Sequence, residues 1–298
     1  MAKHSQDDRG GRHSFGGDWT EKKLHVLASY LRAYTTALRR MPFKLEYIDA
    51  FAGTGHRTAD TGSAGPLFPD LEESAQAWLD GSARRALKID PPFHRYIFIE
   101  RSSGRSQALE SLKKEFPVLA PTIEVHAEEA NVKIKDLCAG DWRGRRAVLF
   151  LDPYGMQVEW ETVRCIAKTQ SIDMWLLFPL GIGVNRLTTT SGDIPPPWRA
   201  RLTALLGTDE WYDAIYRHER APTLFGDEEA VVKASMEVIG GYFVDRLKKV
   251  FSGVAENPLV LRNSKNSPLY LLCFAAGNPR GAPVALRIAK HLLGKGGL

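Results

Sequence analysis

The chain has 298 residues, of which 44% are hydrophobic and 25% are charged, and its formal net charge is +5. No apolar stretch reaches the roughly 18 residues that a membrane span requires, and the polar N-terminus contains no signal-peptide core, so we expect a cytoplasmic globular protein. The three cysteines are far apart and exclude both a disulfide framework and a cysteine zinc site. The mild positive charge permits an anionic partner such as nucleic acid without requiring one.

Residues 1–17 contain almost nothing to bury, and we expect them to form a disordered tail. The rest, 18–298, is expected to form one domain. An amphipathic helix follows the tail, capped by Thr20 and ended before Pro42. Its apolar stripe has the three- and four-residue spacing of a helix and consists of Leu24, Leu27, Leu31, Tyr34 and Leu38.

Five short runs rich in β-branched and aromatic residues predict strands, and helical patterns at 106–116 and 158–168 separate some of them. This alternation is typical of a parallel sheet covered by helices. Two further runs near the end predict an antiparallel addition, followed by a helix at 282–293. The predicted strands are 44–51, 94–100, 122–126, 145–152 and 172–178, then 257–263 and 267–276.

Two stretches interrupt this alternation, at about 57–92 and 188–256, and the second has mostly helical patterns. The predicted fold class is therefore α/β, with a Rossmann-like, mostly parallel sheet, a C-terminal antiparallel strand and helical insertions.

Acidic residues stand at the ends of four predicted strands. Asp49 closes the first and precedes a turn containing Gly53 and Gly55, and Glu100 closes the second. Ligands of open parallel sheets bind beyond the carboxyl ends of the strands, where glycine lets a ligand approach the backbone and an acid can bind a ribose diol. The third strand is followed by Glu128, Glu129 and Asn131, and the fourth ends in Asp152. A nucleoside ligand is the favoured interpretation, and a simple tight turn after the first strand is the alternative.

The segment YIDAFAGTG (47–55) resembles the first motif of class I S-adenosylmethionine-dependent methyltransferases. The resemblance implies S-adenosylmethionine as cofactor, with Asp49, Phe51, Gly53 and Gly55 around its methionine part and Glu100 on its ribose. It also implies that Glu129 or Glu128, with Asn131, lies near the adenine.

The segment LDPYG (151–155) resembles the motif of enzymes that methylate exocyclic amines of bases. Such an amine is a poor nucleophile, so acceptors must take its hydrogens as it attacks. The Asp152 carboxylate and the Pro153 carbonyl are suited to this, and Tyr154 is suited to stack on an extruded base. A capped strand-to-loop turn is the structural alternative.

Seven segments spread over almost the whole chain resemble the three-Cys-motif partner protein family, which is paired genetically with a separate protein carrying three cysteines. They are WTEKKLHVLASYL, YIDAFAGTG, LDPYG, VNRL, LLGTDEW, GYFVDRLK and PLYLLCFAAGNPRG. The resemblance implies a methyltransferase-like fold and a three-Cys-motif protein as partner.

The second insertion mixes aromatic and basic side chains around PPPWRARL and EWYDAIYRHER, which suits nucleic acid. The favoured alternative is a helix that buries Trp211 and Ile215, and with them Tyr212 and Tyr216, and exposes its arginines. The histidines have no ligand spacing, and we expect no metal site.

Two rival functions stay open. One is a Mg²⁺-dependent phosphohydrolase or nuclease that uses Asp49, Glu100 and Asp152, although no second carboxylate stands close to Asp49 in sequence. The other is a non-catalytic protein that binds S-adenosylmethionine and acts with its partner.

Overall fold

The computed structural model describes residues 18–51, 81–223 and 226–295. The predicted tail, the turn glycines Gly53 and Gly55, and the first insertion as far as residue 80 lie outside the described residues.

Eight strands of the described chain form one sheet in the order β3-β2-β1-β4-β5-β10-β8, with β9 paired to β10. The first five run parallel, and β10 runs antiparallel to β5. This is the predicted Rossmann-like methyltransferase sheet with its C-terminal antiparallel strand. The strands are β1 (Lys44–Ala50), β2 (Arg95–Ile99), β3 (Ile123–His126), β4 (Arg145–Leu151), β5 (Ile172–Phe178), β8 (Gly253–Val254), β9 (Leu259–Arg262) and β10 (Pro268–Ala276).

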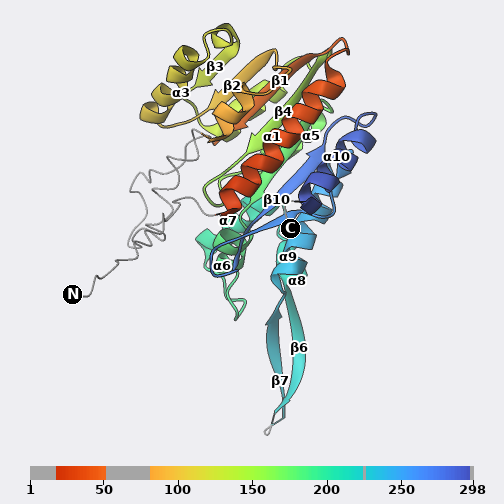
Figure 1. The fold of residues 1–298 in the computed structure, drawn as a ribbon. Coiled ribbons are helices and arrows are strands. Elements are labelled where there is room, and N and C mark those ends of the chain that lie inside the picture. The colour runs from red at the N-terminus through yellow and green to blue at the C-terminus, as the bar shows by residue number, and fades with distance from the viewer. Residues whose placement is uncertain (1–17, 52–80, 224–225, 296–298) are drawn as a thin grey trace, which may run out of the picture.

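Helices cover both faces of the sheet, because alternate side chains of its buried strands point to opposite sides and each side needs an apolar cover. One face, called here the α1 face, packs against α1, α3, α10 and the helical residues 81–87, and the opposite face packs against α4, α5, α7, α8 and α9 (Figure 1). The helices are α1 (Asp18–Leu38), α3 (Ser103–Glu115), α4 (Ala130–Cys138), α5 (Trp160–Lys168), α6 (Asn185–Leu187), α7 (Pro196–Leu206), α8 (Trp211–Ile215), α9 (Met236–Lys248) and α10 (Ala282–Lys295), with short turns η1 (Ala120–Thr122) and η2 (Leu180–Val184).

Helix α1 buries the predicted apolar stripe from Leu24 to Tyr34 and half-buries Leu38, but it begins two residues before Thr20. Thr20 therefore lies in the first helical turn, and the prediction that it caps the helix was wrong. In the middle of the helix the Tyr30 hydroxyl donates to Asp173 Oδ2 at 2.8 Å, and Asp173 Oδ1 accepts from Gly277 N at 3.0 Å. This network joins α1 to β5 and to the end of β10.

The second insertion is not mostly helical as predicted. It contains a two-stranded antiparallel ribbon, β6 (Tyr216–Thr223) and β7 (Gly226–Lys233), which projects from the body (Figure 1). Helix α8 does bury Trp211 and Ile215 as expected, but it ends there and Tyr216 begins β6. Tyr216 is buried at the base of the ribbon, and its hydroxyl donates to Thr189 O at 2.7 Å.

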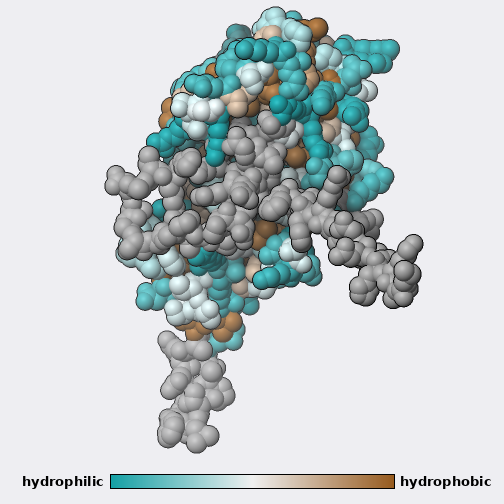
Figure 2. Space-filling view, turned by 60° about the vertical axis from the view of Figure 1, so that its left-hand side comes forward, coloured by the Kyte–Doolittle hydropathy of each residue, from teal (hydrophilic) through white to brown (hydrophobic). Residues whose placement is uncertain are grey.

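No helix of the described chain combines the length and the apolar character needed to cross a membrane. The coloured surface in Figure 2 is mostly hydrophilic, with smaller hydrophobic areas. All three cysteines are unpaired, and burial raises the pKa of Cys138 and of Cys273 to about 12, so these two thiols stay protonated at neutral pH.

Candidate functional site

The site forms where the order of the sheet reverses, between β1 and β4. From β1 the chain builds outward through β2 and β3, then returns to the other side of β1 and builds through β4 and β5. Crevices at such switch points are where open α/β sheets bind their ligands. Asp49 lies in register with Phe98 on one side and Phe150 on the other, so the carboxyl ends of three strands meet around it.

Asp49, Glu100 and Asp152 all belong to the α1 face. Each stands two residues after an aromatic side chain of that face, namely Tyr47, Phe98 and Phe150, and residues two apart in a strand share a side. The acids at the ends of β1, β2 and β4 therefore share one side of the sheet. The same side carries the N-terminal part of α1.

Asp49 is 1% exposed and only partly satisfied. Its Oδ2 accepts from the Tyr47 hydroxyl at 3.0 Å, whereas Oδ1 is enclosed and accepts no hydrogen bond from the described residues. Burial raises the pKa of this carboxyl to about 7, and the nearby Ser82 and Tyr47 hydroxyls offset part of that rise. The Ser82 hydroxyl lowers the pKa in this way although it forms no hydrogen bond with Asp49 Oδ1. A buried acceptor without a donor is unfavourable by itself, so Oδ1 is suited to receive a donor from a ligand.

Lys23, which the sequence reasoning missed, reaches the same place from α1. Its side chain is 0% exposed, and its ammonium lies 2.5 Å from Asp152 Oδ2, whose side chain is 16% exposed. The ammonium also lies over the rings of Trp19, at 5.4 Å, and Phe150, at 5.8 Å. An enclosed charge requires such compensation, because desolvation would otherwise cost several kcal/mol.

Aromatic side chains surround this ion pair. Trp19 stacks on Tyr270 of β10 with ring centroids 5.4 Å apart. Burial raises the pKa of Tyr270, and the nearby Asp152 and Tyr154 raise it further. The predicted catalytic segment is thus brought together with the first turn of α1 and the start of β10. Neither of those two contributions was expected from the sequence.

The residues after Asp152 form a tight loop. Pro153 is buried and Tyr154 is half-buried. The Tyr154 backbone N–H donates to the Gln157 side chain at 3.0 Å, and Gly155 has a φ of 85°, in the left-handed region that favours glycine. The loop therefore holds Tyr154 beside Asp152 through its backbone.

Glu100 is buried at the end of β2, and burial raises its pKa to about 6. Its Oε1 accepts from the Ser102 backbone N–H at 2.6 Å, at the start of α3. Arg105 Nη1, in α3, is buried without a hydrogen-bond partner in the described chain. A ribose diol can donate to the carboxylate, and a ligand oxygen can accept from the guanidinium.

Asn131 and Glu129 have structural roles at the start of α4. Glu129 caps the helix, accepting from Val132 N at 2.9 Å and from Asn131 Nδ2 at 2.8 Å. The same Asn131 amide also donates to Gln157 O, and its Oδ1 accepts from Glu159 N and from the Thr162 hydroxyl. All four hydrogen-bonding positions of Asn131 are thus occupied.

The Asn131 amide consequently has no free donor or acceptor, and its place near the adenine stays a prediction. Glu128 accepts from the Lys133 ammonium at 3.1 Å and is 43% exposed, so it keeps access to solvent. Both glutamates stay predicted neighbours of an adenine.

Phe51 ends the first strand with an unusual backbone conformation. It has a φ of 63°, which is uncommon for a bulky residue, and its ring is buried in the core of the face opposite α1. Its role in the described chain is to turn the backbone at the end of β1 while anchoring that turn. Contact with a methionine chain remains a prediction.

The polar groups of the site suit S-adenosylmethionine in two respects. The enclosed Asp49 Oδ1 can accept from an ammonium group, and Glu100 with Arg105 offers polar groups to a ribose. Within the described residues, no group of three or more His, Cys, Asp or Glu side chains is placed to hold a metal ion.

The fold and the strand-end acids define the class: the chain has a Rossmann-like methyltransferase fold. No protein-family model matches the sequence, and a search of curated proteins finds no match. Similar solved structures include LPL1258 from Legionella pneumophila strain Philadelphia 1, with 13% identity over 94% of this chain and 92% of that chain and a TM-score of 0.45.

Two others are YhhF from Escherichia coli, provisionally assigned as a methyltransferase, and an uncharacterised protein from Burkholderia thailandensis. YhhF has 12% identity over 70% of this chain and 86% of that chain, with a TM-score of 0.27. The Burkholderia protein has 11% identity over 91% of this chain and 84% of that chain, with a TM-score of 0.32. Similarity at these levels carries no argument about substrate or activity.

Proposed function

We propose that this protein is an S-adenosylmethionine-dependent methyltransferase that acts on an exocyclic amine of a nucleic-acid base, in partnership with a three-Cys-motif protein. The observation that carries the proposal is the position of Asp49 and Asp152. Both lie at the switch point, on the same face of the sheet and at the ends of adjacent strands. The Asp49 carboxyl has an enclosed oxygen that accepts no hydrogen bond from the described residues, and the Asp152 carboxyl lies among aromatic side chains.

In this proposal Asp49 and Glu100 hold the cofactor by its ammonium group and its ribose. S-adenosylmethionine supplies an electrophilic methyl group bonded to a sulfonium sulfur. The Gly53 and Gly55 turn belongs to the same site by resemblance. The partner protein is also inferred from resemblance, on the seven matching segments.

Asp152 and the Pro153 carbonyl accept the hydrogens of the acceptor amine, which increases the electron density on its nitrogen. Transfer of the methyl group to this nitrogen would form an N–C bond as the S–C bond breaks, leaving S-adenosylhomocysteine, and the Asp152 carboxylate would stabilise the positive charge on the nitrogen and take its proton. Tyr154 provides a surface for the base, which must leave its stack to reach the site.

Lys23 neutralises Asp152 when no acceptor is present. Because its ammonium already donates to Oδ2, an acceptor amine has either to use Oδ1 or to displace Lys23. The same contact favours a second candidate function, a non-catalytic protein that binds the cofactor and acts through its partner, since an enclosed lysine on the proposed acceptor carboxylate can block transfer.

The decisive experiment has two stages. Mass spectrometry of the purified protein identifies any co-purified small molecule, and calorimetry measures the affinity for S-adenosylhomocysteine. Radiolabelled methyl transfer to total DNA, RNA and protein, with and without the partner, then identifies the acceptor.

We expect binding of S-adenosylhomocysteine and label on nucleic acid, with Asp152→Asn losing transfer and retaining cofactor binding. Cofactor binding without transfer to any acceptor selects the non-catalytic alternative. Label on protein alone refutes the base-amine mechanism.

A further inference from the structure

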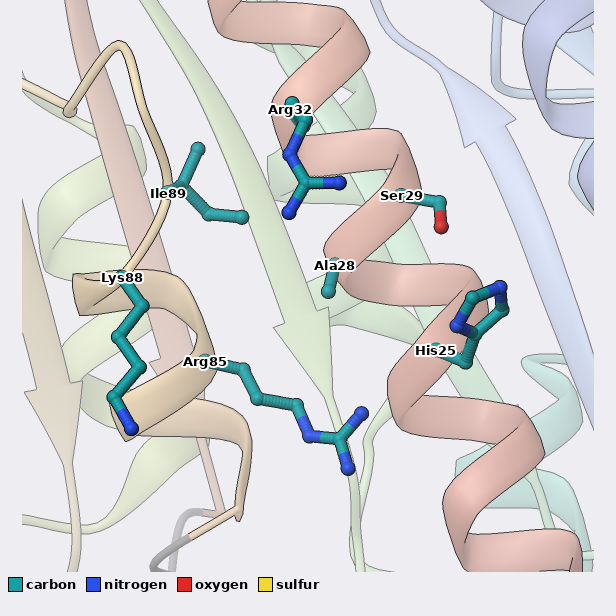
Figure 3. A pocket seen from close by; sticks show the side chains of 7 residues that line it. All are labelled: His25, Ala28, Ser29, Arg32, Arg85, Lys88 and Ile89. Carbon is teal, nitrogen blue, oxygen red and sulfur yellow. The ribbon is translucent and has the colours of Figure 1, made fainter.

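A groove with basic side chains lies between the outer side of α1 and the segment 81–89. It has a volume of about 260 Å³. Figure 3 shows Arg32 and Arg85 extending toward the space between the two segments from opposite sides. The lining residues are His25, Ala28, Ser29, Arg32, Arg85, Lys88 and Ile89.

The charge of the groove is only partly compensated. Arg85 Nη2 lies 2.5 Å from Glu21 Oε2, but that glutamate side chain is 70% exposed, and such pairs contribute little. Arg32 and Lys88 are exposed, and neither has an ion-pair partner within the described residues. His25 and Ser29 add further hydrogen-bonding groups to the lining. The groove thus presents more positive than negative charge to solvent.

The shape of this surface matches an extended polyanion better than a small anion. From His25 to Arg32 the groove follows about two helical turns, or ~10 Å at 1.5 Å per residue. A strand in duplex geometry advances ~3.4 Å per nucleotide, so this length accommodates at most about three phosphates and fewer of an extended single strand. The exposed large hydrophobic side chains of the described chain include none of the groove residues, so the groove offers no anchor for a lipid surface.

The groove and the Asp152 site share one helix. Lys23 points to the sheet and is fully enclosed, whereas His25, two residues later, is exposed on the groove side. Successive helical residues are rotated by about 100°, so two residues apart face nearly opposite directions. The two sites are therefore separated by the width of α1, ~10 Å.

We infer that this groove binds the phosphate backbone of a single-stranded nucleic acid segment. The inference rests on the proposed function in one respect, because it places the backbone of that function's substrate. Arg32 and Lys88 supply the principal phosphate contacts, and Arg85 exchanges its contact with Glu21 for a phosphate.

The test compares two double variants of the full chain. In Arg32→Ala with Lys88→Ala, the groove loses two exposed cations. The matched control, Arg287→Ala with Lys290→Ala, removes one exposed arginine and one exposed lysine from α10. Fluorescence anisotropy measures binding of a labelled 20-nucleotide single-stranded DNA or RNA between 50 and 200 mM salt, and circular dichroism checks that both variants stay folded.

Each phosphate contact in a single strand contributes about 0.7 to the slope of log affinity against log salt concentration. The groove variant should therefore lose about 1.4 from that slope and about 25-fold in affinity at 0.1 M salt. The control variant should keep the wild-type slope. Equal binding by the two variants overturns the inference.

A second arm uses vesicles containing phosphatidylserine. Groove-dependent binding to vesicles, with no binding to either oligonucleotide, also overturns the inference. Methyl transfer is measured separately, so the two proposals can fail independently. If nucleic-acid binding depends on the groove but label appears only on protein, the groove inference stands and the base-amine reaction is refuted. If label appears on nucleic acid but the groove variant binds nucleic acid as the wild type does, the base-amine reaction stands and the groove inference is refuted.

Discussion

Replacing Lys23 with methionine should destabilise the protein, because it removes the ammonium from an enclosed ion pair and keeps the length of the side chain. Breaking a buried pair by removing one partner costs about 3–5 kcal/mol. Asp152 retains 16% exposure, so water compensates part of the loss and we expect about 2–3 kcal/mol. With an unfolding entropy of about 2.1 cal/mol/K per residue over 298 residues, the midpoint should fall by about 3–5 °C.

The assay is urea unfolding followed by circular dichroism. It is applied to Lys23→Met, to Asp152→Asn and to the double variant that combines these two changes. Lys22→Met is the matched control, since Lys22 neighbours Lys23 on α1 but is exposed, and it should change stability by less than about 0.5 kcal/mol. The double variant should be less destabilised than the sum of the two single changes by about 1–3 kcal/mol. Additive effects within about 0.5 kcal/mol would refute the assigned coupling.

Asp49→Asn should change the pH dependence of stability. Burial raises the pKa of Asp49 in the folded protein to about 7, above its unfolded value near 3.9. Ionisation of Asp49 is therefore unfavourable in the folded protein, and wild-type stability falls as the pH rises between about 4 and 7. The difference in unfolding free energy between wild type and variant should change by about 2.5 kcal/mol between pH 5 and pH 8, and a constant difference would contradict the assigned pKa. Calorimetry should show S-adenosylhomocysteine binding to wild type tightening as the pH rises through about 7, because an ionised Asp49 pairs with its ammonium group, and an affinity that falls over this range argues against that pairing. Asn131→Ala should lower the unfolding free energy by about 2–4 kcal/mol, since it leaves several polar groups near α4 and α5 without partners, and a loss below 0.5 kcal/mol would favour a ligand role instead. Replacing 219–230 with Asn-Gly closes the ribbon at the His218–Val231 pair. Differential scanning fluorimetry should give this variant a melting midpoint within about 2 °C of the wild type, and a larger fall would show that the ribbon supports the body.

The central sheet was predictable because its strands are short apolar runs and each parallel strand ends in chemically informative residues. Asp49, Glu100 and Asp152 could be placed at one edge from their positions alone, since parallel strands bring their carboxyl ends together. The shared face of these three acids follows from the two-residue period of each strand. Local pattern was sufficient here because local and tertiary preferences agree.

Lys23 was missed although a signal was present. It stands four residues before Leu27, on the apolar stripe of α1, where a charged residue is out of place unless something compensates it. Its partner is 129 residues away, so no local pattern can name it. A lysine within a buried stripe is therefore a reason to look for a carboxylate at a strand end.

The ribbon was misjudged, whereas the place of Asn131 near an adenine stays a prediction. The helical spacing of Trp211 and Ile215 was extended through Tyr216, although Pro222 is incompatible with a helix interior and Gly226 followed by Asp227 favours a turn. The structural role of Asn131 could not be read from the sequence, because its four hydrogen bonds come from residues distant in sequence as well as near.

The stacking of Trp19 on Tyr270 has a consequence for synthesis of the protein. The two rings are separated by about 250 residues, and a ribosome adding ~5–20 residues per second needs roughly 12–50 s to make the second after the first. During that interval Lys23 and Asp152 can meet, but the side of their enclosure supplied by β10 has not yet been translated. The nascent chain therefore carries an incomplete site until its last strand emerges, and a chain truncated before Pro268 should bind chaperones without acquiring the enclosed ion pair.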